Sequence, residues 1–246
     1  MGTSASSMGP RNNSPIIPEW LVPETGNCLT PANRFTQPRK FAREFLRTSD
    51  GSLIRQALKE YVRKSLGGHS SAGLRFVSFS KVATDVLSFL HGEGFVKEEN
   101  IRNLSGLSPN EVLDLILSQC CPVNGDADKI QDACIEAYSN TQDKYPNLDP
   151  LNLTDEQLAY LITEMLSQML FYQSVNDLGK AFFASASPKA KIELENQVLD
   201  LIREITDKAL AEEKKILGDW PLTRERWQGL LEKVMDTVFR IIEEEE

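Results

Sequence analysis

The feature that most constrains this chain is a recurrence of apolar residues every three to four positions, which begins near Thr30 and continues almost to the C-terminus. This spacing places apolar side chains on one face of an α-helix. The clearest example is a single stripe, formed by Leu53, Ile54, Ala57, Leu58, Tyr61, Val62 and Leu66. No segment shows the sustained period-two alternation of a half-buried strand. We therefore predict an all-α fold, an irregular multi-helix bundle with an extended, flexible N-terminal tail.

Start and stop signals divide the periodic region into helices. Ser108–Glu111 and Thr154–Gln157 both have the pattern of a capping box, in which the first and fourth residues bond each other's backbone N–H groups. Ser187-Pro188 predicts the start of a helix of roughly thirty residues. Gly67-Gly68 predicts the end of the helix that carries the stripe. We expect one further helix to begin near Ser70 and to end around Gly92 and Gly94.

The charge of the chain changes sign along its length. Residues 1–81 hold 12 Lys and Arg and 5 Asp and Glu, a balance of +7, and the remainder holds 15 and 31, a balance of −16, which together give −9. Residues 1–29 are rich in Gly, Ser, Asn and Pro and have too few apolar side chains to form a core. We predict a flexible tail at 1–29, a basic N-terminal helical region at 30–145 and an acidic C-terminal helical region at 146–246.

The predicted tail contains one apolar segment, PIIPEWLVP at residues 15–23. Its prolines favour an extended backbone with accessible side chains. Ile16, Ile17, Trp20 and Leu21 are therefore candidates for binding a partner. The alternative is that Trp20 packs on the chain's own helices.

The first residues offer a chemical group at the end of this tail. Removal of Met1 would expose Gly2 as an unhindered α-amine, because a small second residue permits that cleavage. Residues 1–6 also match the myristoylation pattern MGxxx[ST]. We do not expect a membrane partner, because one acyl chain anchors weakly and no basic run follows Gly2. Gly2 is thus predicted as a modification site.

Basic residues are dense over the first predicted helices: Arg34, Arg39, Lys40, Arg43, Arg47, Arg55, Lys59, Arg63, Lys64 and Arg75. Such density fits a phosphate backbone, an acidic protein surface, or the chain's own acidic half. The three interpretations stay open. The residues that we predict to bind nucleic acid or an acidic partner are Arg39, Arg43, Arg47, Arg55 and Arg63.

The sequence lacks the usual parts of a catalytic or cofactor site. Its two histidines stand in no HExxH motif; we expect His69 in a loop after Gly67-Gly68 and His91 at a helix end, where an imidazolium suits the helix dipole. There is no GxGxxG or Walker loop to hold a nucleotide. Four cysteines without CxxC spacing are expected to be reduced and mostly buried thiols: Cys28, Cys120, Cys121 and Cys134. We therefore expect no catalytic residues, no metal, no cofactor and no enzymatic activity.

No apolar run reaches the ~18 residues of a membrane span, and the first thirty residues do not resemble a signal peptide. We expect a cytoplasmic protein.

Several segments together resemble the QatB family, a component of the Qat bacterial anti-phage defence system. They are MGTSASSMGP, PIIPEWL, NRFTQPRKFAREFLRTSDGSLIRQALKEYVRKSLGG and the helix that ends in VLSFLHG. The resemblance implies a non-enzymatic protein bound to a QueC-like enzyme, QatC, in a system that also groups an ATPase and a TatD-like nuclease.

The resemblance also suggests a reaction for the tail. QueC-type enzymes activate a deazaguanine carboxylate with ATP and then amidate it, and a protein α-amine would replace ammonia. The hypothesis is that Gly2 is conjugated to a deazaguanine, with Thr3 and Ser4 lining the entrance of the enzyme site and the apolar segment holding the tail. The alternative function is a nucleic-acid-binding subunit of the same system that uses the basic helices.

Overall fold

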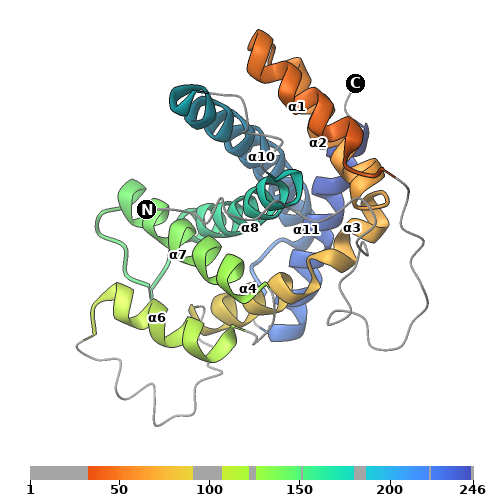
Figure 1. The fold of residues 1–246 in the computed structure, drawn as a ribbon. Helices are drawn as coiled ribbons and strands as arrows, with labels where there is room; N and C mark the ends of the chain where they lie inside the picture. Colours follow the sequence, from red (N-terminus) through yellow and green to blue (C-terminus); the bar gives the residue numbers. More distant parts are fainter. Residues whose placement is uncertain are drawn as a thin grey trace. The chain divides into compact units, whose positions relative to one another are not determined.

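The computed structural model describes residues 33–90, 107–121, 126–150, 152–179, 187–221 and 223–244. These ranges contain nine α-helices, one short π-helical segment and no strand, so the predicted all-α fold is confirmed. The elements are α1 (Thr36–Thr48), α2 (Ser52–Glu60), η2 (Tyr61–Ser65), α3 (His69–Arg75), α4 (Val77–Leu90), α6 (Pro109–Cys120), α7 (Ala127–Lys144), α8 (Asp155–Leu178), α10 (Pro188–Leu217) and α11 (Arg224–Glu244) (Figure 1). None of these helices is long and apolar enough to cross a membrane.

The chain divides into two compact units, each assembled from separate segments. Unit 1 comprises Met1–Phe76, Leu170–Ile205 and Asp236–Glu246, and unit 2 comprises Val77–Met169 and Thr206–Met235. Both units include residues from each side of the predicted boundary between 145 and 146, which lies at the turn-rich segment YPNLDPLN of residues 145–152. The division into a tail at 1–29, a basic region at 30–145 and an acidic region at 146–246 therefore remains a prediction from the sequence.

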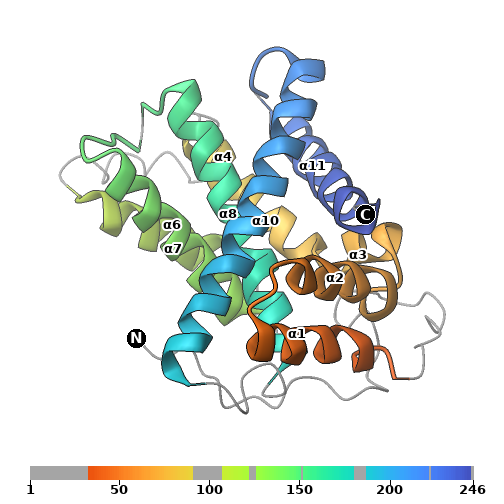
Figure 2. The ribbon, with the colours of Figure 1, turned by 90° about the horizontal axis from the view of Figure 1, so that it is seen from above.

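In unit 1, α1 and α2 lie side by side, as both views of the ribbon show (Figures 1 and 2). Pro38 lies in the first turn of α1, where proline needs no hydrogen-bonded N–H, and Ala42 and Phe45 are buried on the same helix. The apolar stripe of the next helix is also confirmed: Ile54, Ala57 and Leu58 are buried in α2, and the stripe continues into η2. One face of each helix therefore builds the core of this unit.

The predicted stop after the stripe is confirmed. Gly67 and Gly68 have φ angles of 80° and 88°, a region in which a side chain would be strained. The N–H of Gly68 donates to the carbonyl of Val62 at 2.9 Å and so satisfies one of the free carbonyls at the helix end.

The single helix expected from near Ser70 is in fact two helices, α3 and α4, and its expected end around Gly92 and Gly94 lies outside the described residues. The break falls at Phe76, whose ψ angle of 6° departs from helical geometry. The ring of Phe76 is fully buried and its centroid lies 5.2 Å from that of Phe239 in α11. Within unit 1, this ring contact joins the break between the two helices to α11.

The expectation that His69 lies in a loop is wrong, because His69 is the first residue of α3. Its backbone N–H donates to Oε2 of Glu243 at 3.0 Å, and its Nδ1 lies 3.0 Å from the same oxygen. Glu243 thereby satisfies a free N–H at the start of α3. His91 lies outside the described residues.

In unit 2, α4 packs against α6 and α7. Both predicted capping boxes are present. The N–H of Glu111 donates to Ser108 Oγ at 3.4 Å, and Glu111 Oε2 accepts from the N–H of Ser108 at 2.7 Å. Thr154 and Gln157 exchange the same two bonds at 3.3 and 2.9 Å. The helix predicted at Ser187-Pro188 is α10, which starts at Pro188 and contains 30 residues.

Replacing Glu243 with alanine should destabilise the protein by about 1 kcal/mol at neutral pH, because the first N–H of α3 loses a charged acceptor. Burial alone would raise the pKa of Glu243, but its hydrogen bonds with His69 and the nearby charges of His69 and Arg63 lower it. This contribution to stability is present above the unfolded glutamate pKa of about 4.3 and is lost as the pH falls through the lower folded pKa. Urea unfolding of E243A and wild type at several pH values measures it.

The matched control is Glu244→Ala, since Glu244 contacts Arg240 at 3.6 Å with both side chains largely exposed. A stability difference for E243A that persists unchanged well below pH 4 would contradict the assignment.

Candidate functional site

The described residues begin at 33, four positions beyond the end of the predicted tail, and the first buried side chain among them is Arg34. Nη1 of Arg34 donates to the carbonyl oxygen of Ser65 at 3.1 Å, and Ser65 Oγ donates to the carbonyl oxygen of Arg34 at 2.9 Å. Both residues are buried. We call this reciprocal pair the Arg34–Ser65 clamp, and it joins the chain just before α1 to the last residue of η2.

Two guanidinium groups flank the buried ring of Phe35. The Cζ atoms of Arg34 and Arg39 lie 4.5 and 4.8 Å from the ring centroid. Nε and Nη2 of Arg39 also donate to the carbonyls of Leu178 and Asp177, at 3.0 and 2.9 Å. These carbonyls belong to the last turn of α8, where no further helical N–H is available. Arg39 thus caps α8 and holds the start of α1 beside it.

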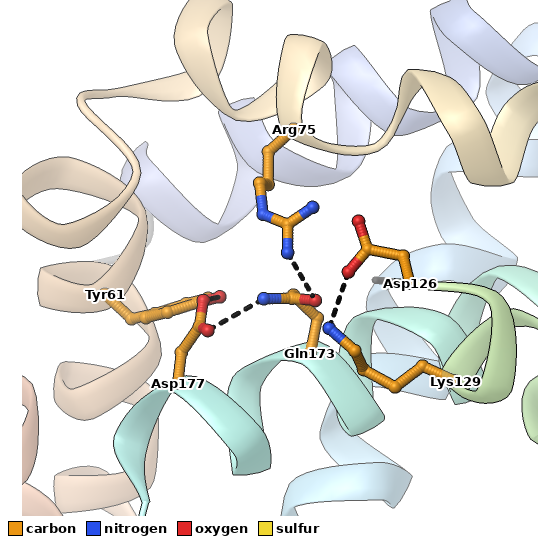
Figure 3. A network of polar contacts seen from close by, with 6 residues as sticks. All are labelled: Tyr61, Arg75, Asp126, Lys129, Gln173 and Asp177. Atoms are coloured by element: carbon orange, nitrogen blue, oxygen red, sulfur yellow. Dashed lines mark hydrogen bonds and ion pairs between the residues drawn. The ribbon is translucent and has the colours of Figure 1, made fainter. Parts of the chain in front are cut away.

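The buried carboxylate of Asp177 is at the centre of a network of polar contacts (Figure 3). Tyr61 donates its hydroxyl to Oδ2 at 2.7 Å, and Gln173 Nε2 donates to Oδ1 at 2.8 Å. Arg75 Nη2 in turn donates to Gln173 Oε1 at 3.1 Å. The ion pair of Asp126 and Lys129 in the same figure, at 2.6 Å, belongs to unit 2.

Burial and charge set the protonation states in this network. Burial raises the pKa of Tyr61 well above its usual range, and the charge of Asp177 and its hydrogen bond raise it further. Burial lowers the pKa of Arg34 and of Arg39, and the carboxylate of Asp177 opposes that change in both. The phenol therefore stays a hydrogen-bond donor at neutral pH, and the arginines stay charged.

Buried charges of this kind add little to stability compared with apolar side chains of similar volume, because each charge loses its hydration. A satisfied polar network does specify one geometry, since every misplaced partner leaves a buried group unpaired. The arrangement therefore fixes where α1 begins, and with it the point at which the tail joins the helices.

Several residues of the predicted basic surface have contacts within the chain. Arg39 is partly buried and donates to two backbone carbonyls. Arg55 lies 3.6 Å from Glu204 in α10, and Arg63 lies 4.0 Å from Glu60. Arg39 and Arg55 thus contact the chain's own C-terminal half. This contact is one of the three interpretations that the sequence left open for the basic residues.

Part of the basic surface is retained on α1. Lys40, Arg43 and Arg47 are exposed, and their spacing of three and four residues places them on one side of the helix. We call these three residues the basic face of α1. The other predicted site residues lie outside the described residues: Gly2, Thr3, Ser4, Ile16, Ile17, Trp20 and Leu21.

The described cysteines show no sign of a reactive or metal-binding role. Cys134 is buried, and burial together with the charge of Asp85 raises the pKa of Cys120 to about 12. Such thiols stay protonated at neutral pH and are poor nucleophiles. The part of the chain that the structure describes contains no group of His, Cys, Asp and Glu side chains that could hold a metal ion. Cys28 lies outside it.

Replacing Tyr61 with phenylalanine should lower the free energy of unfolding by about 1–2 kcal/mol, because Asp177 loses a hydrogen bond in a buried site. Urea unfolding monitored by circular dichroism measures this change. Tyr145→Phe is the matched control, since that hydroxyl bonds Glu156 at 3.0 Å at the surface and its loss should change stability by less than about 0.5 kcal/mol. Equal effects for Y61F and Y145F would contradict the importance of the buried network.

Comparison with known proteins identifies one family. Residues 67–242, more than half of the chain, match a family model described as Qat anti-phage system associated protein QatB. No curated protein and no solved structure matches the chain.

Proposed function

The chain belongs to the QatB family of the Qat anti-phage system, and from this premise we propose that it is a non-enzymatic subunit that presents its N-terminal tail to the QueC-like enzyme QatC. The observation that supports this role most directly is the fixed attachment of the chain at Arg34, five positions beyond the predicted tail. An N-terminal segment that is attached to folded helices at one end and carries a reactive amine at the other has the arrangement expected of a protein substrate. The ATPase and the TatD-like nuclease of the system are further candidate partners.

The reactive group is the α-amine of Gly2. The enzyme would activate the carboxylate of a deazaguanine with ATP, and the uncharged amine would attack the activated carboxyl carbon. A C–N bond forms, the activating group leaves with a carboxylate oxygen, and the nitrogen releases a proton. A terminal amine with a pKa near 8 is uncharged at neutral pH far more often than a lysine with a pKa near 10.4.

The remaining tail residues would bind the enzyme. Thr3 and Ser4 are small enough to follow Gly2 into an active site. Ile16, Ile17, Trp20 and Leu21 would pack on an apolar surface of the enzyme, where each large side chain that is fully buried contributes about 1.5–3 kcal/mol. This division separates the reacting end of the tail from the part that holds it.

Intact-mass measurement of the chain co-expressed with its operon tests the proposal. We expect one added mass, located at the N-terminus by fragmentation, that requires QatC. Gly2→Pro should abolish it, because a proline nitrogen is hindered, whereas Gly9→Ala should retain it. An unmodified N-terminus in every condition contradicts the conjugation.

The basic face of α1 favours a second candidate function, binding of nucleic acid. Three exposed cations on one helical face can follow a phosphate backbone. In this role the chain would present phage DNA or RNA to the nuclease of the system. The proposal is made for Lys40, Arg43 and Arg47 because all three side chains are exposed.

Reversing the three charges of this face, with Lys40→Glu, Arg43→Glu and Arg47→Glu, should abolish binding to single- or double-stranded probes. In wild type, the affinity should fall linearly with salt on a logarithmic scale, with a slope of roughly 0.9 per phosphate contact. Fluorescence anisotropy over a salt series measures both effects. Arg226→Glu on the exposed surface of α11 is the control, and binding that survives the triple reversal contradicts this role for α1.

A further inference from the structure

Unit 2 exposes two neighbouring apolar side chains where α10 ends and the chain turns toward α11 (Figure 2). Ile216 is 77% exposed and Leu217 is 38% exposed, and we call them the apolar pair. They follow the buried residues Ala209 and Leu210 at a distance of seven positions, which is about two helical turns, so both pairs lie on the same face of α10. The apolar face of α10 therefore continues beyond the part that unit 2 covers.

Several contacts fix the turn that follows the apolar pair. Gly218 has a φ angle of 78°, where other residues are strained, and its N–H donates to the carbonyl of Lys214 at 2.9 Å. The ring of Trp220 stacks on that of Trp227 with centroids 5.8 Å apart, and Nζ of Lys214 lies 4.1 Å from the Trp220 ring centroid. Because the turn is already held in place, binding at the apolar pair requires little further ordering.

The charge around the apolar pair is balanced. The exposed side chains among the described residues between 206 and 235 include four cations and four anions: Lys208, Lys215, Arg226 and Lys233, and Asp207, Asp219, Glu225 and Glu232. The other part of unit 2, between 77 and 169, has two exposed cations and nine exposed anions among its described residues: Lys81 and Lys144, and Glu111, Asp114, Asp128, Asp132, Glu136, Asp143, Asp149, Asp155 and Glu156. A second copy of a chain with a net charge of −9 thus meets no excess of negative charge at the apolar pair.

We infer that the apolar pair is an interaction surface for a second copy of this chain, and that Ile216 and Leu217 of one copy pack on those of the other about a twofold axis. In such an interface both copies contribute the same residues, so the surface has to complement itself. A patch with balanced charge meets this condition, because its cations can lie beside anions of the other copy. A surface of one sign, such as the basic face of α1, does not meet it. This inference is independent of the modification proposed for Gly2.

The size of the apolar pair sets the kind of dimer that we expect. A stable protein interface usually buries about 1,200–2,000 Å² in total, and two apolar side chains from each copy supply only a part of that area. The dimer should therefore form reversibly as the concentration rises. Because each chain carries a net charge of −9, added salt should screen the repulsion between copies and strengthen the dimer.

Sedimentation equilibrium of the full chain over a concentration series tests the surface. Wild type should show a monomer–dimer equilibrium, and Ile216→Lys should raise its dissociation constant at least tenfold, since the twofold axis would bring two like charges together in an apolar contact. The matched control is Ile192→Lys, because Ile192 is also an exposed isoleucine of α10, at 59%, but lies in unit 1. I192K should associate like wild type. A monomer at every concentration, or equal effects of the two variants, would overturn the inference.

Chemical cross-linking locates the contact. In the variant Ile216→Cys, a short bismaleimide should join position 216 of one copy to position 216 of the other, because a twofold axis brings the same residue of both copies together. Peptide mass spectrometry identifies the linked positions and so separates this link from links between native cysteines. Ile192→Cys should give no link between two copies of position 192. A dimer without the 216–216 link would contradict the proposed surface.

Other ways of binding give different results in the same experiments. If the basic face of α1 contacted acidic side chains of another copy, the dimer would weaken as salt rises and would be lost on reversing Lys40, Arg43 and Arg47. If Ile216→Lys released another protein of the co-expressed operon and left the dimer unchanged, the apolar pair would be a binding site for that protein. Either result would overturn the assignment of the apolar pair to a second copy.

Discussion

Unit 1 depends on the buried carboxylate of Asp177. Tyr61 and Gln173 donate to its two oxygens, and its charge opposes the effect of burial on the pKa of Arg34 and Arg39. A buried carboxylate that loses one of these hydrogen-bond donors costs about 1–2 kcal/mol, so the donors and the carboxylate are stable only together. The end of α8, the segment η2 and the start of α1 consequently share one arrangement.

This arrangement connects the fold with the proposed function of the family member. Under the proposal, the enzyme would supply the chemistry at Gly2, and the Arg34–Ser65 clamp would hold the chain five positions beyond the predicted tail. Burial and the charge of Asp85 raise the pKa of the described thiol of Cys120 to about 12, so this thiol stays protonated at neutral pH.

The family assignment draws on two parts of the chain that hardly overlap. The sequence motifs that resemble the QatB family lie in the first ninety or so residues, from the opening MGTSASSMGP to VLSFLHG. The family model matches residues 67–242 and shares with those motifs only the stretch from Gly67 to Gly92. The two sources of evidence agree on the family, although each uses residues that the other does not.

The sequence by itself determined the all-α fold and most helix ends, because periodicity, capping boxes and glycine stops act within a few residues. Ser108 with Glu111 and Gly67-Gly68 behave as predicted for that reason. Only the tertiary structure decided the break at Phe76, whose partner Phe239 is 163 positions away, and the role of Arg39, which looked like a surface cation. Likewise, nothing near Tyr61 in the sequence indicates Asp177, 116 positions away. Contacts across such separations depend on how the helices pack against one another. A local sequence pattern, such as a capping box or an apolar stripe, does not determine that packing.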